Sequence, residues 1–389
     1  MTASAEEDMS ATAPHALLDA LAEGAARPLA EAVSLPQAAY HSAGLLALER
    51  ETLFRHGWLC AGRVDEIPRP GDYLSFALAA QPVVSIRQPD GGIRTFANMC
   101  AHRGARLLGE HGNCQRIICP YHAWSYDLAG RLVGAPYMEQ AQGFSVSKVC
   151  LPEIRTEVWA GWLYVTLDDA LPPVATELAG LAEELAMFEM ERYVQILRRD
   201  EIWQTNWKAL AENFMESYHL FQVHPQTVEP DMPTHTTVCV PGADAWCLHY
   251  FYGTPGSDFA TAHPARTHVR GDDRRRNFDA CVFPSHLFAG GHRFIFWLSL
   301  DPRAVDEVGV RWGVAVAPEV LTDAGDRDAY VAATTAAFEE VNREDRALLE
   351  LMQGASATPL ARPGRLSHFE RPLWEFQRFL ARALTASRS

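Results

Sequence analysis

The stretch "CAHRGARLLGEHGNCQRIICPYHAWSYDLAG", residues 100–130, decides how the chain around it folds. It contains two ligand pairs, in which Cys100 is followed by His102 and Cys119 is followed by His122. Sulfur and imidazole donors at such close spacing are typical of a metal site. Two kinds of site use these donors. One is a tetrahedral zinc ion, and the other is a [2Fe–2S] cluster with two cysteines on one iron and two histidines on the other.

The order of the four ligands favours the cluster over zinc. A zinc finger of this composition groups its two cysteines first and its two histidines second. Here each cysteine is followed by its own histidine, and sixteen residues separate the two pairs. Two loops that each supply one thiolate and one imidazole can reach both irons. The sequence therefore predicts a Rieske-type [2Fe–2S] cluster bound by these four residues.

The composition excludes several classes of protein. The chain has 389 residues, enough for two domains, and its formal net charge of −15 argues against sequence-independent binding to nucleic acid. It has no run of about 18 apolar residues, so no membrane-spanning helix is expected. The eight cysteines are too sparse for a disulfide framework, and the N-terminus lacks a signal-peptide pattern. These features favour a cytoplasmic protein.

The expected secondary structure changes twice along the chain. Alternating apolar and polar residues predict strands between residues 58 and 165, with a hairpin turn at Gln88–Gly92. Further strands are expected within residues 245–253, 293–302 and 308–318. Helices are expected over 44–57, 175–191, 205–224, 326–352 and 367–384. This order indicates an α+β fold. The predicted parts are an N-terminal tail or helix at 1–42, a small all-β domain at 43–165 and a larger domain at 166–389.

A second candidate metal site lies in "AENFMESYHLFQVHP", residues 211–225. Two imidazoles and one carboxylate can bind ferrous iron on one face and leave positions open for other ligands. His219 and His224 are separated by about 140° on a regular helix, so they converge only if the helix bends. The bend is expected at His224–Pro225. On this segment alone, two ordinary histidines at a helix surface or at its end are the favoured interpretation.

Three segments resemble those of the Rieske non-haem iron oxygenases. "CAHRGARL" and "CPYHAWSYDLAGRL" are similar to their cluster loops, and "NWKALAENFMESYHLFQVH" is similar to their iron-binding segment. The resemblance covers nearly the whole chain from about residue 40. It implies a small all-β Rieske [2Fe–2S] domain inserted in a catalytic domain of the helix-grip type, which has a central antiparallel sheet.

The resemblance also implies a ligand set for a mononuclear Fe(II). His219 and His224 would bind the iron, with a third ligand from the long C-terminal helix. Asp345 matches the position of that ligand in the family, and Glu344 is the alternative. The other acids of this helix are expected to form a solvated face.

Two further residues are assigned roles by the same resemblance. Glu216 is expected to hydrogen-bond His219 and also His122 of a neighbouring subunit, so that it connects the two metal sites. Asn213 is placed among the catalytic residues. Ring-hydroxylating members usually have Asp at the position of Glu216, whereas oxygenases acting on carnitine and glycine betaine have Glu.

The implied activity is that of a terminal oxygenase. It would use O2 and electrons from a separate NAD(P)H-dependent reductase, with or without a ferredoxin, because the chain has no dinucleotide-binding fingerprint. It would hydroxylate or oxidatively N-demethylate a small organic substrate, with quaternary ammonium compounds as one class. An aromatic ring-hydroxylating oxygenase acting on an aromatic acid is one alternative, and a Rieske electron-transfer protein without catalysis is another. The family implies a head-to-tail homotrimer.

The substrate pocket is expected among the later strands. Their aromatic residues could enclose a quaternary ammonium group or a flat ring, or could simply form the core. These residues are Trp246, Tyr250, Phe251, Tyr252, Phe294, Phe296 and Trp297. Nearby arginines could pair with a substrate carboxylate or belong to solvated loops. They are Arg266, Arg270, Arg274–Arg276 and Arg293.

Overall fold

The computed structural model describes residues 14–358 and 360–386. The chain divides into two compact units. The first runs from Phe54 to Val174, and the second combines the chain up to Leu53 with the chain from Ala175 onward. The first unit is therefore inserted in the second, as the sequence predicts. The predicted tail at 1–42 lies partly outside the described residues, and from Pro14 on it contains helix α2 (Pro14–Ala25).

The inserted unit is built from antiparallel strands. They are β1 (Leu59–Arg63), β2 (Asp72–Leu78), β3 (Gln81–Arg87), β4 (Ile93–Ala97), β5 (His111–Asn113), β6 (Ile117–Ile118), β7 (Ser125–Tyr126), β8 (Leu132–Gly134), β9 (Glu153–Trp159) and β10 (Trp162–Thr166). One sheet has the order β1-β10-β9-β4-β3-β2-β5, and a smaller one has the order β6-β7-β8. The predicted hairpin turn joins β3 to β4, where the Gln88 and Gly92 backbones are hydrogen-bonded. The all-β character expected from the alternating pattern is confirmed.

The core of the inserted unit lies beneath the two candidate cluster loops. Val84, Ile86 and Phe96 from the large sheet pack with Trp124 and Tyr126 from the second loop. This packing holds both loops against the sheet, so burial of apolar side chains positions the candidate ligands.

The larger unit is built around one antiparallel sheet with the order β11-β17-β16-β15-β14-β13-β12. Its strands are β11 (Val194–Trp203), β12 (Val238–Cys239), β13 (Trp246–Tyr252), β14 (Arg276–Val282), β15 (His286–Gly290), β16 (Phe294–Ala304) and β17 (Glu307–Val316). Its helices after α2 are α3 (Ala43–Glu49), α4 (Val174–Glu177), α5 (Ala179–Leu185), α6 (Trp207–Phe214), α7 (Leu220–Val223), α8 (Pro318–Asp323), α9 (Arg327–Ser356) and α10 (Arg371–Thr385). The expected α+β architecture with a central antiparallel sheet is confirmed.

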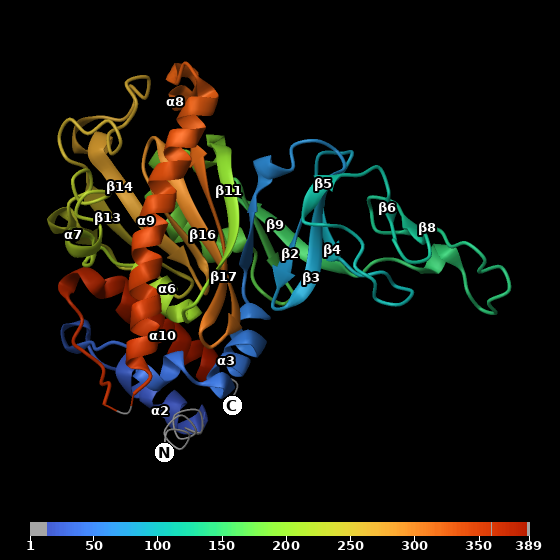
Figure 1. Ribbon diagram of the computed structural model, residues 1–389, viewed down its shortest axis with the longest axis horizontal. Helices are drawn as coiled ribbons and strands as arrows, with labels where there is room; N and C mark the ends of the chain where they lie inside the picture. Colours follow the sequence, from blue (N-terminus) through green and yellow to red (C-terminus); the bar gives the residue numbers. More distant parts are fainter. Residues whose placement is uncertain (1–13, 359, 387–389) are drawn as a thin grey trace. The chain divides into compact units, whose positions relative to one another are not determined.

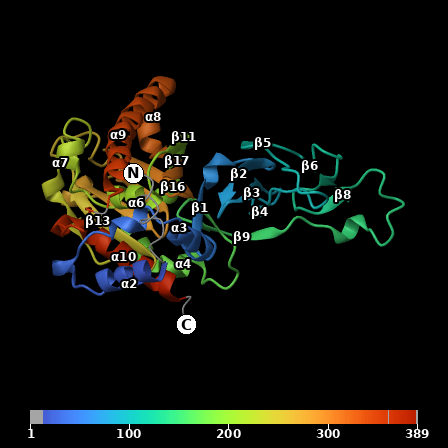
Figure 2. The same ribbon diagram turned by 60° about the horizontal axis from the view of Figure 1, so that its bottom comes forward.

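Helix α9 lies across one face of this sheet (Figure 1). Phe338 of α9 packs against Phe294 and Phe296 of β16, with ring centroids 5.4 and 4.9 Å apart. Helices α10 and α2 pack side by side in the same unit (Figure 2). Among the described residues, no helix combines the length and the apolar character that a bilayer crossing needs.

The helical segment before the inserted unit belongs to the larger unit. α3 continues into a short π-helix, Arg50–Phe54, so the predicted helix over 44–57 stops at Phe54. Glu49 of α3 is fully buried, forms an ion pair with Lys208 of α6 at 2.8 Å, and accepts a hydrogen bond from the Trp207 indole. These contacts explain why the inserted unit begins at Phe54 and not at the expected residue 43. Its end at Val174 lies beyond the expected residue 165.

Glu212 of α6 is buried beside this ion pair and accepts a hydrogen bond from the Tyr40 hydroxyl. Burial raises the pKa of its carboxyl from 4.5 to about 7, although Tyr40 and Lys208 act in the opposite direction. The folded state therefore binds this proton more tightly than the unfolded state. The contribution to stability is present below pH 4.5 and is lost as the pH rises towards 7.

We expect Glu212→Gln to remove this pH dependence. Between pH 4.5 and 7 the unchanged protein should lose stability on the order of 3 kcal/mol through Glu212, whereas the glutamine variant should not. Urea unfolding followed by circular dichroism at several pH values measures the difference. The exposed Glu191→Gln is the control and should keep the slope of the unchanged protein. Identical slopes for Glu212→Gln and the unchanged protein would contradict the assignment.

Candidate metal centres

The segment that carries His219 and His224 is not one helix, as the sequence predicted, but two short ones. α6 ends at Phe214, and the four-residue α7 follows, with His219 before its first residue and His224 after its last. The Glu216 carboxylate accepts hydrogen bonds from the backbone N–H groups of Tyr218 and His219. Such side-chain acceptors compete with helical hydrogen bonds and interrupt the helix. The predicted bend therefore lies before His219 as well as at His224.

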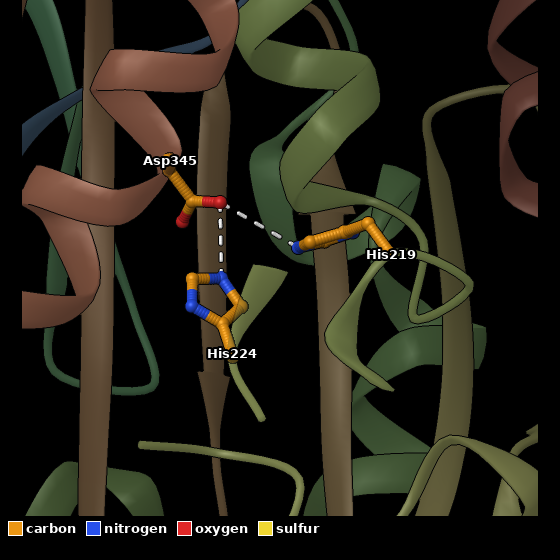
Figure 3. Close-up of side chains that lie close together, drawn as sticks. All are labelled: His219, His224 and Asp345. Carbon is orange, nitrogen blue, oxygen red and sulfur yellow. Dashed lines mark hydrogen bonds and ion pairs between the residues drawn. The ribbon is translucent and has the colours of Figure 1, made fainter. Parts of the chain in front are cut away.

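This interruption brings the two histidines together with Asp345 of α9 (Figure 3). Asp345 Oδ1 lies 3.0 Å from His224 Nε2 and 3.6 Å from His219 Nε2. One ligand atom from each of the three residues lies within 4.8 Å of the others. Two imidazole nitrogens and one carboxylate oxygen are the donor set of a facial iron site, so the three residues fit a ferrous ion.

Each histidine is oriented by a second carboxylate on its other ring nitrogen. Glu216 Oε1 lies 2.6 Å from His219 Nδ1, and Glu344 Oε2 lies 2.7 Å from His224 Nδ1. Carboxylates in this position fix the tautomer and the ring orientation of metal-binding histidines. Glu344, expected only as an alternative ligand, therefore holds His224 while Asp345 faces both Nε2 atoms. Thr227 donates a hydrogen bond to the same Glu344 oxygen at 2.7 Å and fixes it in turn.

The charges at this site suit a cation. Burial lowers the pKa of His219, but the charge and hydrogen bond of Glu216 outweigh this effect, and the net pKa is raised. Burial likewise lowers the pKa of His224, and Asp345 and Glu344 raise it to a net increase. Three carboxylates around two imidazoles give the site an excess of negative charge, which a divalent metal ion would balance.

The remaining acids and amides of the two helices lie at different distances from this centre. Asn213 Nδ2 is 3.4 Å from Asp345 Oδ1, a long contact that places the amide beside the candidate ligand. Glu339 forms an ion pair with Arg199 of β11 and Glu350 with Arg346 of α9, as expected for a solvated acidic face. Glu212 points away, towards Tyr40.

A cavity of about 450 Å³ opens beside the three candidate ligands. It lies between the sheet and α9, with His219, His224 and Asp345 in its wall. Its apolar lining is dominated by phenylalanines, which are Phe214, Phe251, Phe259, Phe294, Phe296 and Phe338. Its polar lining includes Asp231, His249 and Asp279, and among the described residues that line it none is a lysine or an arginine.

The alternation of side chains along each strand decides which of the predicted aromatic residues can line the cavity. Of the seven, Phe251, Phe294 and Phe296 line the cavity. Tyr250 lies on the opposite face of the sheet, where its hydroxyl bonds Glu184, and Trp297 bonds Gln195. Successive side chains of a strand point to opposite faces, so only every second residue can reach the cavity.

The arginines considered for a substrate carboxylate are used elsewhere. Arg274 donates hydrogen bonds to backbone carbonyls of its own loop, and Arg293 donates to the Thr261 carbonyl. Arg266 is buried, donates to the Phe188 carbonyl and lies over the Tyr193 ring. None of the six lines the cavity. The cavity therefore gives no support to the interpretation as carboxylate partners, and the contacts of Arg266, Arg274 and Arg293 favour the alternative that these guanidinium groups hold their own loops.

The four predicted cluster ligands also converge, in the inserted unit. Cys100 and Cys119 are both 3% exposed, whereas His102 and His122 are exposed, with ring centroids 4.8 Å apart. Two buried sulfurs beneath two exposed imidazoles fit a [2Fe–2S] cluster with an inner cysteine-bound iron and an outer histidine-bound iron. The His102 ring stacks on Trp124 at 4.8 Å, which fixes its orientation.

Sequence reasoning missed one residue at this centre. Tyr126 of β7 places its hydroxyl 3.2 Å from Cys100 Sγ and accepts a hydrogen bond from the Ala101 N–H. Its proton is then free to be donated to the sulfur. Burial raises the pKa of Tyr126, which keeps the phenol protonated. Hydrogen bonds to cluster sulfurs are one means by which proteins set the reduction potential.

We expect Tyr126→Phe to lower the reduction potential of the cluster. The hydrogen bond favours the reduced state, which carries more negative charge, and a net loss of about 1 kcal/mol corresponds to a shift on the order of 40 mV for one electron. A redox titration followed by EPR measures this shift. Tyr121→Phe is the control, since its exposed hydroxyl contacts Arg103 and not a sulfur. An unchanged potential in Tyr126→Phe would contradict the role.

Relatives of known activity match about half of the chain. A glycine betaine monooxygenase oxygenase subunit from Chromohalobacter salexigens is 36% identical over 194 residues, which are 50% of this chain and 43% of that protein. A carnitine monooxygenase oxygenase subunit from Acinetobacter baumannii is 31% identical over 223 residues, which are 56% and 59% of the two chains. The chain thus spans roughly half the length of the curated relatives it matches.

Solved structures share the fold over nearly the whole length. A quaternary ammonium Rieske monooxygenase in complex with L-carnitine superposes with a TM-score of 0.78 at 24% identity, covering 93% of this chain and 98% of that one. Naphthalene 1,2-dioxygenase from Rhodococcus sp. superposes with a TM-score of 0.79 at 20% identity, covering 96% and 99%. At these identities the likeness establishes the fold.

Two family descriptions match the two units. Residues 57–151 match the Rieske [2Fe-2S] domain, and residues 183–386 match the catalytic domain of ring hydroxylating alpha subunits. The first match contains all four candidate cluster ligands, and the second contains His219, His224 and Asp345. The chain belongs to the Rieske-type ring-hydroxylating oxygenase alpha subunits.

Proposed function

We propose that the chain is the terminal oxygenase of a multicomponent system that hydroxylates or oxidatively N-demethylates a small organic cation. The observation that carries the proposal is the convergence of His219, His224 and Asp345 beside a phenylalanine-lined cavity, in a chain that also carries a Rieske domain. A pure electron carrier would need neither this ligand set nor the cavity.

Each set of residues has a defined task in this reaction. When bound, the mononuclear iron would activate O2 and the cluster would deliver electrons one at a time. The side chains of Glu216 and Glu344 hold the two imidazoles so that both Nε2 atoms face Asp345. The phenylalanine wall excludes water and holds the substrate next to these ligands.

The N-demethylation balances with two external electrons. A quaternary ammonium N–CH3 group, O2, two electrons and two protons give N–CH2OH and water. The N–CH2OH group then loses formaldehyde and a proton, and the tertiary amine keeps the electron pair of the broken C–N bond. The electrons come from a separate NAD(P)H-dependent reductase, with or without a ferredoxin.

The character of the cavity supports a cationic substrate over an aromatic acid. Aromatic faces attract ammonium groups, and the cavity also carries the carboxylates of Asp231 and Asp279. An aromatic acid would bring a further carboxylate to this acidic lining without an ammonium group to balance its charge. The names of the relatives, which act on glycine betaine and carnitine, point in the same direction.

We also propose the head-to-tail homotrimer that is implied by the family. His102 and His122 are exposed at the surface of the Rieske unit, so a cluster that they hold would be accessible to a partner. In the larger unit Glu216 already contacts His219, which is half of the expected connection. The other half would be a hydrogen bond from Glu216 to His122 of a neighbouring subunit. Sedimentation of the holoenzyme tests the trimer directly.

Glu216→Ala should slow the reaction without emptying either metal centre. Loss of a carboxylate that orients a metal-binding histidine typically lowers metal affinity or activity by about 10- to 100-fold. We expect the reoxidation of the reduced cluster in a single turnover to slow by this factor. Iron and sulfide content should stay unchanged, which separates the effect from loss of metal. Reoxidation at the rate of the unchanged protein would contradict the connecting role.

The proposed activity is tested by O2 uptake with purified reductase. Trimethylammonium compounds should give O2 consumption, a demethylated amine and formaldehyde in equal amounts. An aromatic acid giving a hydroxylated ring would favour the ring-hydroxylating alternative. If the protein holds both metal centres but no compound supports O2 uptake, the result would favour the alternative of an electron-transfer protein without catalysis.

A further inference from the structure

One row of residues crosses the cavity wall from strand to strand. Asp279 of β14 is the register partner of His249 on β13 and of Ala289 on β15. Ala289 is in turn the partner of Phe296 on β16. Directly opposed residues of antiparallel strands point to the same face, and all four line the cavity.

Asp279 is the unexplained member of this row. Its Oδ1 atom is closed off from solvent and has no hydrogen-bond partner among the described residues. His249 stands beside it with both ring nitrogens unpartnered as well, so the two side chains do not satisfy each other. Buried polar groups are almost always hydrogen-bonded, so one carboxyl oxygen without a partner is unusual. Because the same side chain lines the cavity, a ligand there is a candidate partner for the carboxyl group.

We propose that Asp279 is the counter-ion of the substrate, holding its cationic ammonium group against the phenylalanine rings of the cavity. This assignment rests on the proposed function and names the residue that recognises the charge. Phe251 lies two residues from His249 on the same face of β13, and Phe296 lies across Ala289. The small Ala289 side chain leaves room between carboxylate and ring, where an N-methyl group can contact the ring face.

The charges around Asp279 support a ligand cation as its partner. Burial, and then the negative charge of Glu216, raise the pKa of Asp279 well above its ordinary value. Burial also lowers the pKa of His249 to about 3, so this imidazole is neutral and cannot balance a negative charge on Asp279. The facing position on β15 is Ala289, which does not titrate. The raised pKa shifts this carboxyl towards its protonated form, and an arriving cation favours the ionised form.

The test compares two probes of the same shape. Choline carries a trimethylammonium group, and 3,3-dimethylbutan-1-ol replaces that group with an uncharged tert-butyl group. Binding to the anaerobic holoenzyme is measured by titration calorimetry in buffers of different ionisation enthalpy. We expect choline to bind at least about tenfold tighter than the alcohol and to release a proton, which the buffer dependence of the heat reveals.

Asp279→Asn keeps the size of the side chain and removes its charge. It should lose most of the tenfold preference and all of the proton release. Asp301→Asn is the matched control, because Asp301 is a partly buried acid on β16 that pairs with Arg303 and does not line the cavity. Asp301→Asn should keep both the preference for choline and the proton release. Circular dichroism and iron content establish that each variant is folded and loaded.

Two results would overturn the assignment. They are equal or undetectable binding of both probes by the unchanged holoenzyme, and an undiminished preference for choline in Asp279→Asn. Failure of the proposed function looks different, since it would leave charge-selective binding intact while no trimethylammonium compound supports O2 uptake. Conversely, N-demethylation with an unchanged preference in the variant would leave the function standing and remove only the role of Asp279.

Discussion

Holoenzyme carrying His219→Ala is expected to contain about two irons and two acid-labile sulfides per chain, against about three irons and two sulfides in the unchanged protein. The iron that is lost is the mononuclear one. Substrate-dependent O2 consumption should fall below detection, while the EPR signal of the reduced cluster is kept. Iron and sulfide analysis together with EPR measures all three quantities.

The size of this effect follows from the geometry of the site. In the part of the chain that the structure describes, three side chains offer ligand atoms that lie within 4.8 Å of one another. Removing His219 leaves His224 and Asp345, and it also leaves the Glu216 carboxylate without the imidazole it holds. The helix interruption that presents His219 has no other histidine to offer as a substitute.

The control for this experiment is His235→Ala. His235 is exposed and does not line the cavity, so its loss should change neither iron content nor activity. An unchanged iron count in His219→Ala, on samples reconstituted with ferrous iron, would show that the third iron does not depend on this ligand set. The assignment of the mononuclear site would then be wrong.

The centres were predictable from sequence to very different degrees. The cluster ligands lie in two short segments, and their order along the chain already distinguishes a two-iron cluster from zinc. The mononuclear site joins residues far apart in sequence, since Asp345 lies on α9 and the histidines flank α7. No local pattern distinguishes Asp345 from Glu344, because neighbouring residues of a helix differ only in direction. The family resemblance favoured Asp345 over Glu344. The structure distinguishes the two acids, because Asp345 faces the Nε2 atoms of both histidines whereas Glu344 contacts Nδ1 of His224.

The cavity wall was harder to predict than the metal ligands. Strand alternation separates Phe251 from Tyr250, but the sequence does not say which face is covered by α9 and which by other helices. The role proposed for Asp279 could not be predicted from the sequence around it. The proposal depends on the residues opposite Asp279 on the neighbouring strands, which the local sequence does not identify. Similarly, the interruption after Phe214 depends on the Glu216 side chain capping its own turn.

Cys119→Ala should have the complementary effect to His219→Ala. The cluster needs both thiolates, so its two irons and two sulfides should be lost together with the visible colour, while about one iron per chain remains. O2 consumption should again fall below detection, this time because no electrons reach a loaded mononuclear site. Metal and sulfide analysis with EPR distinguishes the two variants directly.

The loss of the cluster should also destabilise the inserted unit. Cys100 and Cys119 are part of its buried core, and Tyr126 bonds the sulfur of the first. Because metal binding contributes to folding free energy, the variant should unfold at a lower urea concentration and be cut faster by protease between residues 54 and 174. Cys114→Ala is the matched control, a half-buried free thiol between the two loops, and should keep colour and protection. Cluster loss in Cys114→Ala, or a retained cluster in Cys119→Ala, would contradict the ligand set, because the four ligands leave no role for a third cysteine.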